Sequence, residues 1–121
     1  MTTTEANTPD LSTPGKAYNY AEKLKDSGKL AEAAEVCEQL LSQWPDYVYA
    51  HLMLGKIYVV LGKPEEAVRH NERACELEPD DALNQSALSV SYQRAWEATR
   101  DPRFIQMAEE AKARSHRLHG H

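Results

Sequence analysis

A 34-residue repeat constrains this chain more than any other feature of its sequence. Residues 28–33 are GKLAEA and residues 62–67 are GKPEEA, so the two stretches start 34 residues apart. Aligning Pro45 with Pro79 superposes them without a gap. Apolar residues recur at helical spacing on both sides of each Gly-Lys pair, so each period contains two helices with a glycine between them. A helical pair repeated at this period is typical of an α-solenoid, in which each unit packs on its neighbours.

The chain has room for three such units. They cover about residues 14–47, 48–81 and 82–115. In the third unit, aligning both helices with those of the second requires about three inserted residues near Trp96. We therefore expect the first helix of this unit to be about one turn longer than its counterparts.

Local signals place the ends of the domain. Thr13 and Asp101 each precede a proline, and each is a candidate N-cap followed by a residue that the first helical turn tolerates. The polar, apolar-poor residues 1–13 predict a disordered leader. We therefore predict an all-α domain of six helices over residues 14–118, followed by a short tail at residues 119–121.

Composition narrows the class of protein. The net charge is −5, which argues against a general affinity for nucleic acid or anionic membranes. Cys37 and Cys75 are too few for a disulfide framework, and both lie in apolar helical stretches, so we expect buried, reduced thiols. The first residues have neither a basic start nor an apolar core, and no apolar run reaches the length of a membrane span. These observations predict a soluble cytoplasmic protein.

The middle unit, at residues 48–81, resembles the tetratricopeptide repeat family. The positions that carry the resemblance are Leu54, Gly55, Tyr58, Gly62, Ala67, Ala74 and Pro79. His51 and Asn71 depart from it, because the family favours large apolar residues at both positions. The resemblance implies a right-handed superhelix in which the first helix of each pair lines a concave, ligand-binding face.

Three sequence features could indicate a ligand-binding site, but a structural role explains each of them better. The Gly-Lys pairs lack the strand and the Ser/Thr of a phosphate-binding loop, so their glycines are better explained as helix ends. Glu66 and His70 lie four residues apart, which favours a surface salt link over a metal site. The terminal stretch HRLHGH favours a frayed tail over a metal site. No nucleophile has a base and an acid at a convincing spacing, so we predict a non-catalytic protein without cofactor or metal.

The helix expected at residues 47–61 is the most informative for function. Its strongly polar residues are His51 and Lys56, and a helix that is apolar all round is covered on all sides. On the resemblance, part of that cover would be a ligand in the groove, although these side chains could instead tighten the core of a small array. The predicted contacts with a protein partner are Tyr18, Tyr49, Leu52, Met53, Lys56, Val60, Leu83, Val90 and Arg94.

The resulting hypothesis is a protein-binding module that takes an apolar or amphipathic segment in its groove. A second hypothesis is a self-assembling scaffold, because the acidic front of the chain could stack on its basic rear. Residues 1–93 hold eight Lys/Arg and fifteen Asp/Glu, whereas residues 94–121 hold six and four. A narrower variant of the first is a cytoplasmic chaperone for an exported apolar protein.

Overall fold

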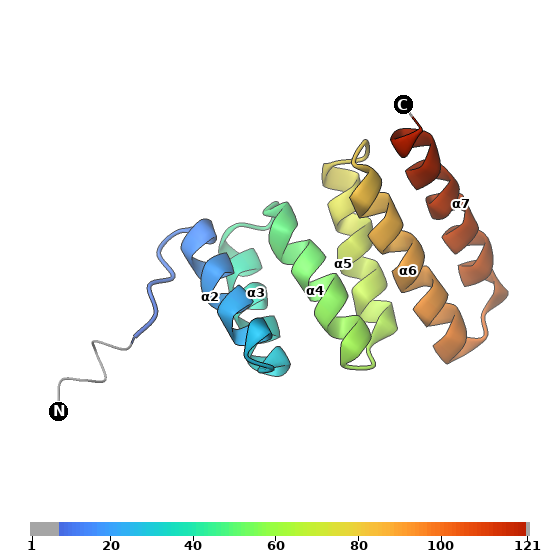
Figure 1. The fold of residues 1–121 in the computed structure, drawn as a ribbon. Helices are drawn as coiled ribbons and strands as arrows, with labels where there is room; N and C mark the ends of the chain where they lie inside the picture. Colours follow the sequence, from blue (N-terminus) through green and yellow to red (C-terminus); the bar gives the residue numbers. More distant parts are fainter. Residues whose placement is uncertain (1–7, 121) are drawn as a thin grey trace.

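The computed structural model describes residues 8–120 and contains six α-helices in that range (Figure 1). Their bounds are α2 (Pro14–Asp26), α3 (Leu30–Gln43), α4 (Val48–Val60), α5 (Pro64–Leu77), α6 (Ala82–Thr99) and α7 (Pro102–His119). Residues 1–7 of the predicted leader lie outside the described range, and residues 8–13 contain no helix. His119, assigned to the tail from the sequence, is the last residue of α7, and His121 lies outside the described range.

Glycine in the left-handed conformation ends the first helix of two units. Gly28 and Gly62 have φ angles of 82° and 78°. Past each glycine the chain folds back on the helix, and Lys29 N–H donates to Leu24 O at 2.9 Å while Lys63 N–H donates to Tyr58 O at 2.7 Å. These bonds satisfy carbonyls that a helix end leaves unpaired. The repeated Gly-Lys pairs are therefore turns between helices.

Side-chain caps start three of the helices. Thr13 Oγ1 accepts from Lys16 N at 3.2 Å, and Asp101 Oδ1 accepts from Arg103 N at 3.0 Å, as the sequence predicted for both residues. Asp81 caps α6 in the same way. The helix α6 has 18 residues against 13 in α2 and in α4, in agreement with the insertion expected in the third unit.

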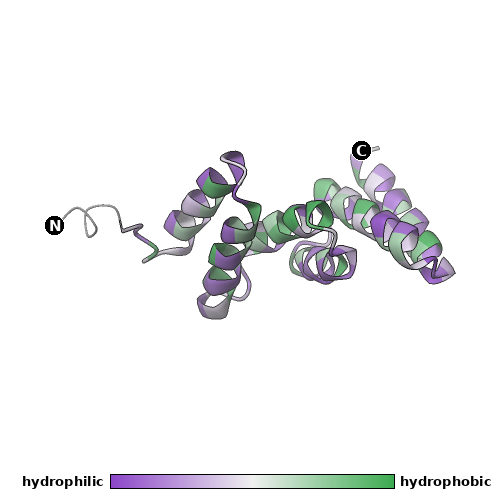
Figure 2. Ribbon diagram, turned by 90° about the horizontal axis from the view of Figure 1, so that it is seen from below, coloured by the Kyte–Doolittle hydropathy of each residue, from purple (hydrophilic) through white to green (hydrophobic). Residues whose placement is uncertain are grey.

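The helices lie in a row, and each packs mainly on the helices next to it in sequence (Figure 1). The pairs α2–α3, α4–α5 and α6–α7 form the three units, and α4 also contacts α6. Figure 2 shows that individual helices carry both hydrophobic and hydrophilic residues. Fully buried alanines, among them Ala33, Ala67 and Ala111, let the paired helices approach closely.

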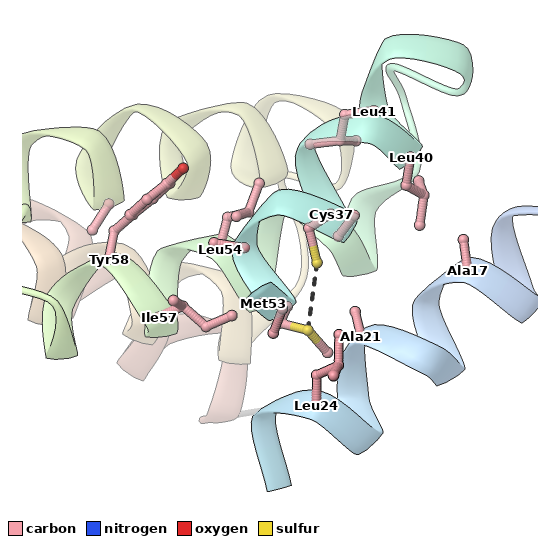
Figure 3. Close-up of a cluster of buried hydrophobic side chains, with 14 residues drawn as sticks. Ala17, Ala21, Leu24, Cys37, Leu40, Leu41, Met53, Leu54, Ile57 and Tyr58 are labelled. Atoms are coloured by element: carbon pink, nitrogen blue, oxygen red, sulfur yellow. Dashed lines mark hydrogen bonds between the residues drawn. The ribbon is translucent and has the colours of Figure 1, made fainter. Parts of the chain in front are cut away.

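The core of the first two units is built around α3 and α4. Leu40, Leu54 and Ile57 are almost completely buried there (Figure 3). Cys37 Sγ lies 3.5 Å from Met53 Sδ, within this core. Cys37 and Cys75 are both free and buried, as predicted, and burial raises the pKa of the Cys37 thiol to about 12.

Asn71 occupies a position where the family favours a larger apolar residue. Its carboxamide lies over Gly55, where a Cβ atom on the glycine would collide with it. Asn71 Nδ2 donates to Ala87 O at 3.4 Å, so the side chain also contacts the next unit. The glycine therefore makes room for a polar residue at the junction of the second and third units.

Candidate protein-binding groove

The first helices of the three units, α2, α4 and α6, form one continuous face with two hollows. The hollow between α2 and α4 has a volume of about 200 Å³, and the hollow between α4 and α6 has a volume of about 290 Å³. The first is lined by Tyr18, Glu22, Lys25, Tyr49, Leu52, Met53 and Lys56. The second is lined by Gly55, Lys56, Val59, Asn71, Ala87 and Val90. Six of the nine residues expected to bind a partner therefore line these two hollows.

A cluster of three tyrosines lies at one end of this face. The ring centroids of Tyr18 and Tyr49 are 6.0 Å apart, and those of Tyr47 and Tyr49 are 5.7 Å apart. Burial and the nearby Glu22 carboxylate raise the pKa of the Tyr18 hydroxyl, so the phenol is neutral at physiological pH. Tyr49 is 56% exposed although it touches two aromatic rings, so its face remains open to a ligand.

Lys56 lines both hollows and lies between them. In residues 8–120 its ammonium group takes part in no ion pair. Leu52 lies beside it in the first hollow, which also holds Glu22 and Lys25, and Val90 lies beside it in the mainly apolar second hollow. A cation in this position can hold a carboxylate or a carbonyl oxygen of a bound chain.

Comparison with known proteins identifies the repeat. A family model described as "Tetratricopeptide repeat" matches residues 24–89, more than half of the chain. The chain belongs to the tetratricopeptide repeat family. It is 40% identical over 62 residues to the TPR repeat-containing thioredoxin TTL4 of Arabidopsis thaliana, a match that spans 50% of this chain and 9% of that protein.

The crystal structure of MamA has the same fold. It superposes with a TM-score of 0.78 at 13% sequence identity, over 92% of this chain and 61% of that chain. The chain thus spans less than two thirds of the length of either relative. These matches establish an all-α tetratricopeptide repeat solenoid and, with it, a protein-interaction module.

One predicted contact of the tetratricopeptide groove lies in the core. Met53 is 3% exposed, and its sulfur contacts Cys37, so it forms the floor of the first hollow and is not a free anchor. Its place in the hollow agrees with the sequence expectation, while its burial against α3 leaves little of the side chain open to a partner.

The remaining predicted contacts lie on the surface. Val60, Leu83 and Val90 are exposed apolar residues, and Leu83 is 71% exposed. Arg94 is exposed as well, but its guanidinium pairs with Glu97 one turn along the same helix, at 2.9 Å. Arg94 is therefore already engaged by its own helix.

Sequence reasoning missed Tyr47. This residue precedes α4 and joins the aromatic cluster through its contacts with Tyr18 and Tyr49. The available signal was the spacing of Tyr47 two positions before Tyr49, which was itself among the expected contacts.

A histidine pair lies inside the second tetratricopeptide unit, and the predicted Glu66–His70 surface link is wrong. His70 is buried and points to His51, with 3.0 Å between their Nδ1 atoms. His51 Nε2 lies 2.8 Å from Pro45 O and donates to it, so His51 Nδ1 accepts and His70 Nδ1 donates. This arrangement leaves His70 Nε2 unprotonated, buried, and 3.6 Å from Glu38 Oε2.

The described residues contain no group of three or more His, Cys, Asp or Glu side chains placed to hold a metal ion. Of the predicted tail histidines, His116 and His119 belong to α7. No helix in residues 8–120 is long and apolar enough to cross a membrane.

Proposed function

We propose that the chain binds an apolar or amphipathic segment of a partner protein across the face formed by α2, α4 and α6. The observation that carries this proposal is the row of exposed apolar side chains on that face. Tyr49, Val60, Leu83 and Val90 are exposed on α4 and α6, between and beside the two hollows. Apolar patches of this kind mark interaction surfaces, and aromatic and aliphatic anchors concentrate binding energy.

Lys56 favours a ligand that carries a hydrogen-bond acceptor. A segment that fills both hollows passes over its ammonium group, which has no partner within residues 8–120. The favoured ligand therefore carries two apolar side chains with an acidic or carbonyl oxygen between them. The proposed function is binding without a catalytic step.

The test uses a displayed library of 12-residue peptides panned against the full chain. We expect enriched peptides to bind the wild type, and the double variant Tyr49→Asp/Leu83→Asp to bind them at least tenfold more weakly. The two aspartates place charges on the exposed apolar row, where desolvating them opposes binding. Titration calorimetry measures the affinities, and circular dichroism checks that the variant keeps its helices.

Met107→Asp is the matched control. Met107 is an exposed apolar residue of α7 and lines neither hollow, so its replacement should leave peptide affinity unchanged. Enriched peptides that bind the double variant as tightly as the wild type would refute the groove as the binding site.

Self-assembly remains a distinct hypothesis with less support than peptide binding. Head-to-tail stacking brings α2 of one copy to α7 of the next, and both helices carry more Lys and Arg than Asp and Glu. Repulsion between like charges opposes this contact. The chaperone variant differs from the main proposal in its client alone, an exported apolar protein, and the same groove would serve it.

A further inference from the structure

Successive units are joined by a hydrogen bond that recurs at the repeat interval. Tyr58 O–H donates to Glu38 Oε2 at 2.5 Å, and Tyr92 O–H donates to Glu72 Oε2 at 2.6 Å. In each case the carboxylate belongs to the second helix of one unit and the phenol to the first helix of the next. Glu38 and Glu72 thus lie where the second helix of one unit contacts the first helix of the next.

Glu109 occupies the corresponding place in the third unit. Within the second unit, the backbone of Gly55 lies against Asn71, and within the third, Ser89 Oγ donates to Ala108 O at 2.9 Å. Gly55 and Ser89 are one repeat interval apart, so their contacts Asn71 and Ala108 are structurally equivalent. The residues that follow these two are Glu72 and Glu109. In the described part of the chain, no hydrogen bond or ion pair engages the exposed Glu109 carboxylate.

The surface around Glu109 resembles the interface between two units, but no helix of a next unit covers it in the described part of the chain. A hollow of about 270 Å³ lies between α6 and α7, lined by Ser89, Gln93, Trp96, Ile105, Ala108, Glu109 and Lys112. Ile105 is equivalent to Val68, which is 7% exposed beneath α6, whereas Ile105 itself is 42% exposed. The equivalents of Ile105, Ala108 and Glu109 in the second unit all contact or underlie α6, which lies against both α4 and α5.

We propose that this edge, formed by α6 and α7, binds the first helix of a tetratricopeptide unit of a partner protein, with a tyrosine hydroxyl of that helix donating to Glu109. The edge continues the interface that the chain builds twice internally, and the repeated bond defines the group that its occupant supplies. A phenol donating to a carboxylate makes a charge-assisted hydrogen bond, which is stronger than a neutral one.

Lys112 adds a second requirement. It is equivalent to Cys75, whose thiol pKa is raised mainly by burial and to a smaller extent by the nearby Asp81 carboxylate, which caps α6. An N-cap aspartate on the incoming helix would therefore approach Lys112. The expected partner helix carries an N-terminal carboxylate and, eleven residues later, a tyrosine, the separation between Asp81 and Tyr92 in this chain.

A second copy of this chain fits the edge less well. The residue of α2 equivalent to Tyr58 and Tyr92 is Leu24, which has no hydroxyl to donate. The helices α2 and α7 also carry net charge of the same sign. Both observations favour a different protein as the occupant.

The probe for the test is a peptide of residues 81–99 of this chain, held helical by a lactam bridge on the face opposite Tyr92. Titration of the 15N-labelled full chain with this peptide should shift the amide resonances of Trp96 and of residues 105–112. The Tyr92→Phe peptide, or the Glu109→Ala protein, should bind about tenfold more weakly, because each removes the charge-assisted bond. Glu110→Ala removes a neighbouring exposed carboxylate and should leave affinity unchanged.

The controls separate this edge from the groove. The groove variant Tyr49→Asp/Leu83→Asp should bind the helical peptide as the wild type does. Shifts confined to the groove, absence of any shift with the helical peptide, or equal affinity of the Tyr92→Phe peptide would overturn the proposal. Sedimentation that shows self-association of the wild type and a monomeric Glu109→Ala variant would overturn the assigned partner in favour of a second copy.

Discussion

His70 is the residue whose protonation the fold opposes most directly. Burial is the main reason that its pKa lies below the ordinary value, and His51 from α4 and Arg69 from α5 lower it further, while Glu38 from α3 raises it. The neutral imidazole donates to His51 and leaves Nε2 without a partner. A proton on Nε2 would gain the Glu38 carboxylate but place a charge in a buried position, and the lowered pKa means that the burial cost dominates.

Acid should therefore destabilise the fold through this residue. A pKa that is lower in the folded than in the unfolded chain gives stability that is present above about pH 6.5 and lost as the pH falls from there through the folded pKa. We expect the urea-unfolding free energy of the wild type to decline from pH 7 to pH 5 more steeply than that of His70→Phe. The phenyl ring keeps the contact with Tyr58 and does not titrate.

His116→Ala provides the comparison for this experiment, since His116 is exposed on α7. Its pH profile should follow that of the wild type. Parallel profiles for wild type and His70→Phe would contradict the assignment of the acid sensitivity to His70.

At the scale of single elements, the turn after α4 depends on glycine. Gly62 has a φ of 78°, a conformation that costs a residue with a Cβ atom about 1 kcal/mol. Gly62→Ala should therefore lower the free energy of unfolding by about 1 kcal/mol in urea denaturation. Gly15→Ala is the matched control, because Gly15 lies in helical α2 with open space around its Cα and should lose nothing.

Helix boundaries were predictable because their causes are local. The positive φ of Gly28, the N-cap of Thr13 and the proline at the start of α5 depend on neighbouring residues of the chain, and the sequence displays them directly. The 34-residue period then fixes how the helices pair.

The facing of individual side chains on α4 was less predictable. This helix is apolar nearly all round, so its pattern does not distinguish the side that packs on α3 from the side that faces solvent. Met53 was placed in the groove by the family resemblance, and it lies at the floor of the first hollow with its sulfur against Cys37. His70 was placed on the surface because Glu66 lies four residues before it, yet it is buried and satisfied in part by His51, a partner from another helix.

For the whole molecule, the number of neighbours differs from helix to helix. The helix α4 contacts α3, α5 and α6, whereas α7 packs mainly on α6. In a solenoid, stability is the sum of the unit and interface terms, so an element with fewer interfaces opens at lower free energy. Native-state hydrogen exchange should find the slowest amides in α4 and faster exchange in α7. Equal protection of the two helices would instead indicate one all-or-none unit.

The hydrogen bonds between units would also allow one copy of the middle unit to pack on another copy of itself. Besides the two phenol–carboxylate bonds, His51 Nε2 and Gln85 Nε2 each donate to the carbonyl of the preceding Pro45 or Pro79, at 2.8 and 3.1 Å. If residues 48–81 were duplicated in tandem, the second Tyr58 would meet the first Glu72, and the second His51 would meet the first Pro79 carbonyl. Gene duplication in steps of 34 codons could thus lengthen this protein without requiring a new contact, whereas a duplication out of that phase would mismatch the residues at the junction it creates.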